Sequence, residues 1–375
     1  MTAISHPEFN SQTEGLSVAR AFADGIRGKT IIVTGVNRGG IGFSTAEAFA
    51  SQSPAHLILA GRNPAKLQEC ISSLNAAYPG IDCQSLIVDL ASQQSVRDAA
   101  KELLSRSDIP AIDIMVNSAG IMMLPERTLV AAADGTAGIE LTFATNHIGH
   151  FLLTCLIMPK LIKSSSSGGA RIVNVSSGSP MFAKMRWSDL TFEKINADLP
   201  ETEQPDYDLH RVWGTADPGQ ESYIPLEAYN QSKVANVLFS IAANKRLYEK
   251  YGVLSVAVHP GVITTELGRN GGPRMAAVVK AMAEQGVFTY KTLGAGASTS
   301  LVAALDPKLG PGGDRREEEE EEEDGKRGGR RSENHGVYLV DCQISDQAHP
   351  LAVSSVEAEK LWTLSEELVG EKFAW

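Results

Sequence analysis

Cysteine is scarce in this sequence, which holds four in 375 residues, at positions 70, 83, 155 and 342. Their wide spacing matches neither a CxxC motif nor a set of metal ligands, so it excludes a disulfide-based scaffold and favours reduced thiols. The eight histidines are scattered as well. We interpret them, including His147, His150, His210 and His259, as structural or solvated, and we predict no metal site.

Positive charge is in deficit, since the formal net charge is −11. Nucleic acids and anionic membranes attract basic surfaces, so neither is expected as a partner. Part of the excess lies between Asp314 and Arg331, where nine acidic and six basic residues give −3 and leave −8 for the rest. The segment 311–335 cannot bury apolar surface and is predicted to be a disordered, charged loop insertion.

Long hydrophobic runs are also missing. The longest strongly apolar segment, FLLTCLIMPKLI, has about 12 residues and contains Pro159, whereas a membrane-spanning helix needs about 20. The N-terminal stretch MTAISHPEFNSQTEG is polar and lacks the apolar region of a signal peptide. We therefore expect a cytoplasmic protein without stable membrane insertion.

What the sequence does contain is an alternation of short β-branched runs and longer helical patterns. Strands are predicted at 30–34, 56–60, 84–88, 112–116, 171–175, 254–258 and 336–341. Helices are predicted at 42–52, 64–77, 92–105, 138–163, 226–251 and 356–369. This order predicts an α/β fold: one doubly wound (Rossmann) domain over residues 1–375, with a mostly parallel seven-stranded sheet and helices on both faces.

The first strand leads into a glycine-rich turn, in KTIIVTGVNRGGIGFSTAEAFA from Lys29 to Ala50. A strand, a glycine-rich turn and a helix in this order hold a dinucleotide pyrophosphate, because backbone amides and the positive helix end meet the phosphates. The expected contacts in the turn are Gly35, Asn37, Arg38, Gly40, Ile41 and Gly42.

The turn after the second strand indicates which dinucleotide binds. An NAD-preferring site usually has an acidic residue there for the ribose hydroxyls, but this chain has Gly61 and Arg62. Arg62 and Arg38 could clamp a 2′-phosphate. The sequence therefore favours NADP(H), and NAD(H) is the alternative.

Further residues follow later strands, at the sheet edge where such folds bind ligands. LIVDLAS and DIMVNSAG come after the third and fourth strands, and HPGVITTEL follows the sixth. The cofactor contacts expected there are Asp89, Leu90, Asn117, Ala119, Gly120, Pro260, Gly261, Val262 and Thr264.

The segment AYNQSKVANVLF places Tyr229 and Lys233 four residues apart, on one face of a predicted helix. A phenol titrates near 10, but an adjacent ammonium and an oxidised nicotinamide would lower that pKa, by about two to three units. Tyr229 could then act as acid towards a carbonyl or as base towards an alcohol. Ser176 or Ser177 could bind the substrate oxygen, and Asn146 could hold a water that relays protons to Lys233.

These ordered motifs resemble the short-chain dehydrogenase/reductase family over about residues 28–342. The resemblance implies a catalytic tetrad of Asn146, Ser177, Tyr229 and Lys233, with Tyr229 and Lys233 also contacting the cofactor. NHIGHFLLT, MRWSDLTFEKI and GVYLVDC look like its retinol-dehydrogenase and WW-domain-oxidoreductase branch, which implies lipophilic substrates. The glycine loop is one residue longer than is usual in the family, and we expect the extra residue to lengthen the loop tip.

The 52 residues from Ser177 to Tyr229 are a second departure from compact family members. We expect residues 179–225 to form an insertion near the substrate pocket, although a plain surface excursion is the alternative. Its candidate pocket aromatics are Trp187, Tyr207, Trp213 and Tyr223.

The leading hypothesis is an NADP(H)-dependent oxidoreductase that transfers a hydride between nicotinamide and a carbonyl/alcohol pair on a small molecule. Two alternatives share the fold: a cofactor-binding regulatory or scaffold protein with weak activity, and an isomerase or epimerase of nucleotide sugars. The complete tetrad argues against the first, and the absence of a carboxylate after the second strand argues against the other. The sequence leaves a homodimer open.

Overall fold

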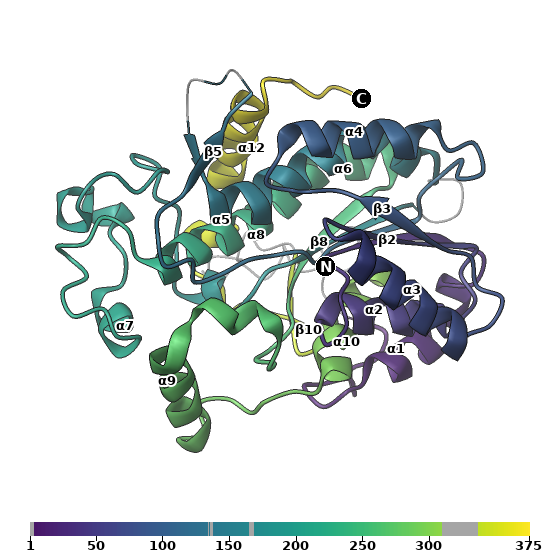
Figure 1. The fold of residues 1–375 in the computed structure, drawn as a ribbon, viewed down its shortest axis with the longest axis horizontal. Helices are drawn as coiled ribbons and strands as arrows, with labels where there is room; N and C mark the ends of the chain where they lie inside the picture. The colour runs from purple at the N-terminus through teal and green to yellow at the C-terminus, as the bar shows by residue number, and fades with distance from the viewer. Residues whose placement is uncertain (1–3, 134, 136–137, 165–168, 310–336) are drawn as a thin grey trace, which may run out of the picture.

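The computed structural model describes residues 4–133, 135, 138–164, 169–309 and 337–375 (Figure 1). The predicted charged insertion at 311–335 lies outside these residues. The described part of the chain forms an α/β fold around one eight-stranded sheet, which confirms the predicted doubly wound class. All strand pairs in this sheet are parallel except the last, β9 with β10.

The strand order is β10-β9-β8-β7-β4-β1-β2-β3. The strands are β1 (Thr30–Thr34), β2 (His56–Gly61), β3 (Cys83–Ile87), β4 (Ile114–Asn117), β7 (Arg171–Val175), β8 (Leu254–His259), β9 (Tyr338–Val340) and β10 (Gln343–Ile344). Each of the seven predicted strands exists, and the two-residue antiparallel edge strand β10 is additional. The chain turns back at β1, which pairs with both β2 and β4, so the turns after β1 and β4 lie next to each other.

Helices cover both faces of the sheet (Figure 1). One face carries α1 (Gly15–Ala21), α2 (Ile41–Ala50), α3 (Pro64–Ala77) and α10 (Leu293–Leu305), and the other carries α4 (Gln93–Ser105), α6 (Gly149–Lys163), α8 (Pro225–Tyr251) and α12 (Ser355–Val369). Each face of the sheet has its own hydrophobic core. Along β1, Ile31 and Val33 pack into the core on the α2 side, and Ile32 packs into the core on the α6 side. A strand buried on both faces has no polar positions, which explains why the sequence shows apolar runs instead of alternation.

The predicted helix 138–163 begins later than expected. Gly138–Glu140 is instead strand β6, which pairs with β5 (Leu129–Ala131) in a separate two-stranded sheet. The Glu140 carboxylate accepts hydrogen bonds from the Phe143 amide and the Thr142 hydroxyl, both at 2.9 Å, and so starts the helix at α5 (Leu141–Phe143). A π-helical turn, η2 (Ala144–Ile148), connects α5 to α6.

The continuous helix Leu141–Lys163 is long and apolar enough to cross a membrane by length and composition. However, 83% of its apolar window is buried inside the fold. Its apolar residues are therefore accounted for by the protein core, where Phe151 packs edge-on against Trp362 of α12.

The segment 179–225 contains short helices: η4 (Ser179–Met181), η5 (Asn196–Asp198), η6 (Glu201–Glu203) and α7 (Tyr207–Val212). It projects to one side of the sheet (Figure 1). Two further helices, α9 (Gly272–Glu284) and the buried α10, follow β8 and were not predicted. Additional short helices are η1 (Ala23–Gly25), η7 (Glu266–Asn270) and η8 (Pro350–Val353).

Candidate active site

The glycine loop between β1 and α2 is shaped by close backbone approaches. Gly35 has φ +72°, and a Cβ there would lie 2.5 Å from the Ala119 Cα. A Cβ on Gly42 would lie 2.6 Å from the Gly35 carbonyl oxygen. The loop tip closes through a 3.0 Å hydrogen bond from the Gly40 amide to the Asn37 carbonyl, and Gly39 has φ +74° in open space. The extra residue is thus accommodated at the tip, because glycine adopts positive φ without strain.

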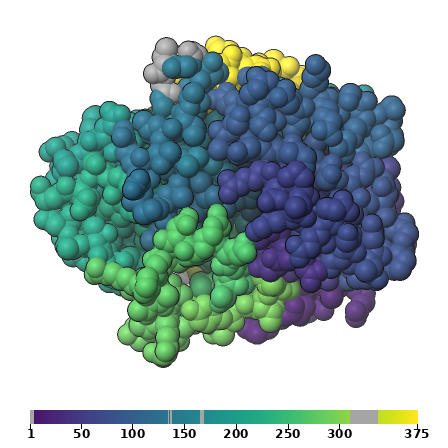
Figure 2. All heavy atoms as spheres, viewed as in Figure 1, coloured from purple at the N-terminus to yellow at the C-terminus, as the bar shows by residue number. Residues whose placement is uncertain are grey.

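This loop forms one end of a cleft of about 690 Å³ at the carboxyl edge of the parallel strands. In Figure 2 a hollow opens beside the segment that follows β8. Most of the predicted site residues line the cleft: Gly35, Asn37, Gly40, Ile41, Gly42, Arg62, Asp89, Leu90, Ala119, Gly120, Ser177, Tyr229, Lys233, Pro260 and Gly261. Residues from six separate turns and one long helix therefore meet in one place.

Five predicted site residues do not line the cleft: Arg38, Asn117, Asn146, Val262 and Thr264. The Arg38 guanidinium lies over the Phe43 ring, 4.9 Å from its centroid, and hydrogen bonds to the Ser73 hydroxyl. The Asn117 amide is buried and donates to the Thr154 hydroxyl and the Asn174 side chain. Both side chains support neighbouring structure instead of facing the cleft.

Sequence reasoning missed several residues that do line the cleft, among them Lys66, Thr265, Glu266 and Arg269. The Glu266 carboxylate lies 3.2 Å from the Lys66 ammonium and accepts a hydrogen bond from the Asn37 side-chain Nδ2 at 3.3 Å. The turn after β2, where an NAD-preferring site would place an acidic residue, has no carboxylate. The structure adds a carboxylate at this end of the cleft from η7, some 200 residues later.

Tyr229 and Lys233 lie on the first turns of α8, and both side chains are buried. Burial raises the pKa of Tyr229 to about 12, and hydrogen bonding with the Ser177 side chain acts in the opposite direction. Burial lowers the pKa of Lys233 to about 7. In the protein alone desolvation outweighs the favourable groups, and the lowered tyrosine pKa expected beside an oxidised nicotinamide stays a prediction for the complex. The charge of an oxidised nicotinamide would act only in the complex.

The Lys233 ammonium lies 5.6 Å from the Tyr229 ring centroid and donates to the Val175 carbonyl at 2.7 Å. Of the two serines after β7, the Ser176 hydroxyl is occupied, since it donates to the Lys233 carbonyl at 2.7 Å. The Ser177 side chain reaches the Tyr229 hydroxyl. This arrangement fits the assignment of Ser177, not Ser176, to the substrate oxygen.

Asn146 lies in the π-helical turn and holds the loop that follows β4. Its side chain accepts from the Ile121 amide and donates to the Ile121 carbonyl, both at 2.9 Å, and also donates to the Ser232 hydroxyl. Gly120 separates it from Lys233, because a Cβ on Gly120 would lie 3.4 Å from the Asn146 Oδ1 and 3.6 Å from the Lys233 Nζ. The proposed water relay between Asn146 and Lys233 stays a prediction.

His150 hydrogen bonds to groups that hold the same loop. Its Nδ1 lies 3.1 Å from the Asn146 carbonyl oxygen and its Nε2 lies 2.8 Å from the Thr34 hydroxyl. The Thr34 hydroxyl in turn accepts from the amides of Ser118 and Ala119, both at 3.0 Å. Burial lowers the pKa of His150 to about 4, so the ring is neutral at pH 7. This placement agrees with the prediction that His150 is structural or solvated.

Comparison with known proteins identifies the family. Residues 29–188 match the family model described as short chain dehydrogenase. The chain is 36% identical to oxidoreductase fscI of Fusarium equiseti over 254 residues, covering 68% of this chain and 94% of that protein. It is 30% identical to mouse retinol dehydrogenase 12 over 364 residues, covering 94% and 92%.

Another relative is the chloroplastic short-chain dehydrogenase TIC 32 A of Brassica napus. The two sequences are 32% identical over 343 residues, which cover 91% of this chain and 88% of the relative. Among solved structures, a short-chain type dehydrogenase/reductase from Mycobacterium marinum shares the fold with a TM-score of 0.50 at 19% identity, covering 75% of this chain and 90% of that one. The protein belongs to the short-chain dehydrogenase/reductase family. It falls in the retinol-dehydrogenase-like branch of these oxidoreductases, which act on CH–OH and C=O groups with a nicotinamide cofactor.

Proposed function

We propose that this protein is an NADP(H)-dependent oxidoreductase that interconverts a carbonyl and an alcohol on a lipophilic small molecule, with Tyr229 as general acid and base. The observation that supports this most strongly is a single cleft that joins Ser177, Tyr229 and Lys233 to the glycine loop. A scaffold protein would not need the buried Tyr229 and Lys233 side chains and the half-buried Ser177 side chain to converge in this way.

The cleft fits a dinucleotide. The backbone approaches at Gly35 and Gly42 leave no room for a Cβ, which is the property that lets backbone amides reach a pyrophosphate. Arg62 and Lys66 line the cleft on the β2 side and would meet a 2′-phosphate there. Tyr229 and Lys233 would hold the nicotinamide end.

When bound, NADPH supplies the hydride that the substrate carbonyl carbon accepts. The Tyr229 hydroxyl donates its proton to the carbonyl oxygen, so the carbonyl becomes an alcohol with hydride and proton balanced. The Ser177 hydroxyl holds the same oxygen, and the Lys233 ammonium favours the phenolate that forms. In the reverse direction the phenolate accepts the alcohol proton.

The preference for lipophilic substrates is supported by the surroundings of Tyr229. Ile224, Leu226 and Tyr229 form a small buried cluster, against which Met122, Met123 and Trp213 pack. These side chains make an apolar surface next to the tyrosine. Relatives named retinol dehydrogenases, whose name denotes a lipophilic alcohol, agree with this inference.

The test is direct. Purified protein is mixed with aromatic, aliphatic and steroid-like aldehydes and ketones in the presence of NADPH or NADH, and nicotinamide absorbance is followed. We expect oxidation of NADPH with at least one lipophilic carbonyl. Failure with every carbonyl, and with the corresponding alcohols and oxidised cofactors, would refute the proposed function.

Arg62→Asp tests the cofactor preference. The change places a negative charge where a 2′-phosphate would lie, so the Kd for NADPH should rise at least about tenfold more than the Kd for NADH. Cofactor fluorescence titration measures both constants. Arg27→Asp is the control, because Arg27 is exposed and pairs with Asp24 away from the cleft. Equal weakening of both cofactors would show that Arg62 does not read the phosphate.

Trp213→Ala tests the insertion as a pocket wall. Trp213 packs on the cluster around Tyr229, so its loss should raise KM for bulky substrates by about 10- to 100-fold. The Kd for NADPH should stay within about twofold.

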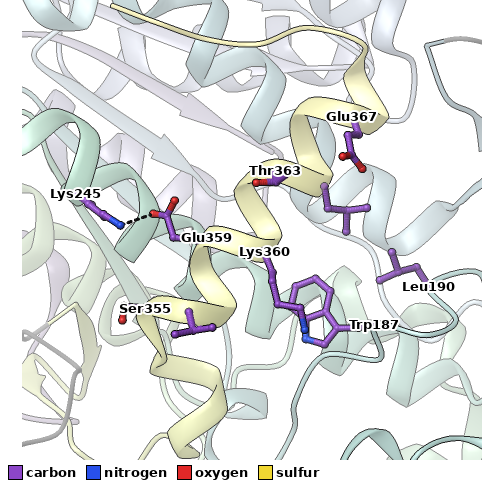
Figure 3. Close-up of a pocket in the computed structure, with 10 residues that line it drawn as sticks. Trp187, Leu190, Lys245, Ser355, Glu359, Lys360, Thr363 and Glu367 are labelled. Atoms are coloured by element: carbon purple, nitrogen blue, oxygen red, sulfur yellow. Dashed lines mark ion pairs between the residues drawn. The ribbon is translucent and has the colours of Figure 1, made fainter.

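Trp187→Ala is a matched control from the same insertion. Trp187 lies against α12, with Lys360 4.7 Å from its ring centroid, in a groove outside the cleft (Figure 3). Tyr207 is also placed elsewhere, since its hydroxyl donates to Gln204. If the two tryptophan variants behave alike, the pocket wall must be built from other residues.

A further inference from the structure

A chain of hydrogen bonds leads away from Ser177 into the insertion. The Ser177 hydroxyl donates to the Ser179 hydroxyl at 2.8 Å, and Ser179 donates to the Asn230 side-chain oxygen at 2.8 Å. The Asn230 side-chain nitrogen donates to the Glu227 carboxylate at 3.1 Å. The same carboxylate oxygen lies 2.9 Å from the His210 Nε2.

The members of this chain come from three elements and are removed from solvent. Ser179 belongs to η4, Glu227 and Asn230 to α8, and His210 to α7 of the insertion. Their exposed fractions are 4% for Ser179, 6% for Glu227, 1% for Asn230 and 0% for His210. Buried polar groups without partners are costly, so each of these bonds strongly constrains its neighbours.

The carboxylate sets the direction of every bond in the chain. A carboxylate only accepts, so the side-chain nitrogen of Asn230 must face Glu227 and its oxygen must face Ser179. Ser179 therefore donates to Asn230, and its lone pairs face Ser177. For the same reason the hydrogen of His210 lies on Nε2, and its Nδ1 has no partner among the described residues.

We propose that Ser179, Asn230 and Glu227 are positioning residues for Ser177, and that His210 couples the insertion to this serine. The inference rests on the proposed function, because it assumes that Ser177 holds the substrate oxygen. The Ser179 amide also donates to the Ser177 oxygen at 3.0 Å, which fixes that oxygen. When a carbonyl enters, the Ser177 hydroxyl needs only to rotate its hydrogen from Ser179 to the substrate.

The consequence is that Glu227 affects the reaction without touching the substrate. Glu227→Gln keeps the size and one acceptor of the side chain but adds a donor, so the Asn230 amide is no longer held in one orientation. Ser179 can then donate to Ser177 or to Asn230, and the Ser177 hydroxyl loses its defined direction. We expect kcat to fall about tenfold, while the Kd for NADPH changes less than twofold.

A double-mutant cycle separates this role from a general structural one. In the Ser177→Ala background, Glu227→Gln should lower kcat by less than about twofold, because the group it positions is gone. His210→Leu should follow the same pattern with a smaller effect. Glu140→Gln is the control, since this buried glutamate caps α5 and is not part of the hydrogen-bonded series from Ser177 to His210. If Glu227→Gln lowers kcat equally in both backgrounds, or leaves wild-type kcat unchanged, the proposal is overturned.

Thermal denaturation of the same proteins gives a readout that needs no turnover. Glu227→Gln and Ser179→Ala should be non-additive in unfolding free energy, whereas Glu140→Gln and Ser179→Ala should be additive. Additivity of the first pair would contradict a connected chain even if no substrate is found. A wild-type protein inactive on every carbonyl and alcohol, with the first pair non-additive, would refute the proposed function and leave the chain in place.

Discussion

Replacing Tyr229 by phenylalanine should lower kcat for carbonyl reduction by about 10²–10⁴-fold and leave the Kd for NADPH within about twofold. The phenylalanine ring keeps the packing against Ile224 and Leu226 and loses only the hydroxyl. In the protein alone the phenol is protonated at neutral pH, since burial raises the pKa of Tyr229 to about 12. The residue is therefore ready to donate its proton.

The control for this variant is Tyr207→Phe, which removes a hydroxyl that donates to Gln204 in the insertion. Its kcat should match that of the wild-type protein. Steady-state kinetics with a carbonyl from the panel that the wild-type protein reduces provide kcat, and fluorescence titration provides the Kd for NADPH. Retention of kcat within a few-fold in the Tyr229→Phe protein would eliminate Tyr229 as the proton donor.

Much of this site was accessible from sequence because its residues follow strand ends. In a parallel sheet the carboxyl ends of neighbouring strands meet at one edge, so Gly35 after β1 and Ala119 after β4 had to approach each other. The pair Tyr229 and Lys233 was likewise fixed by helical spacing. Local patterns of this kind predict which residues converge without any knowledge of the loops.

The rest of the site depends on contacts between distant segments. Glu266 reaches Lys66 across the cleft, and no local pattern indicates that pairing. The insertion has no hydrophobic period because it is organised around Arg186, a buried residue that bonds to Asp189 and the Lys194 carbonyl and lies over the Phe192 ring. Polar contacts of this type leave no trace in hydrophobic periodicity.

The unpredicted helix α10 shows a different limit. Its sequence, LGAGASTSLVAAL, has four alanines and three leucines, but its two glycines, two serines and one threonine weaken the helical signal. Small residues on all sides instead allow α10 to pack closely against α1 and α2. The helix lacks a polar face because all of its residues from Ala295 to Leu305 are buried, so it has no amphipathic period by which to recognise it.

Replacing Lys233 by methionine should abolish most turnover and yet not destabilise the empty protein at pH 7. Burial lowers the pKa of Lys233 to about 7, so the folded protein holds this ammonium at a cost in free energy. The substitution removes one hydrogen bond, to the Val175 carbonyl, but that carbonyl also accepts from the Asn236 side-chain Nδ2 at 3.2 Å. We expect kcat to fall by about 10²-fold or more and the melting temperature to stay equal or rise.

The difference in unfolding free energy between the wild type and the Lys233→Met variant should change with pH in a defined direction. Between about pH 7 and the ordinary lysine pKa of about 10.4, the unfolded chain binds a proton that the folded protein has released. Stability rises with pH wherever the unfolded state binds more protons, so the unfolding free energy of the wild type should rise relative to the Lys233→Met variant across this window. Below about pH 7 the difference between the two proteins should be constant.

Lys160→Met is the matched control for this prediction. Lys160 is also buried, but its ammonium donates to the backbone carbonyls of Arg106 and Ile109, away from the cleft. Its replacement leaves two carbonyls without this donor, so it should lower the melting temperature and spare kcat. Chemical denaturation from pH 6 to pH 10 measures the unfolding free energy of the wild type and of both variants. A Lys233→Met protein that is less stable than the wild type at every pH would show that the buried ammonium stabilises the fold, so that holding Lys233 in the cleft carries no stability cost.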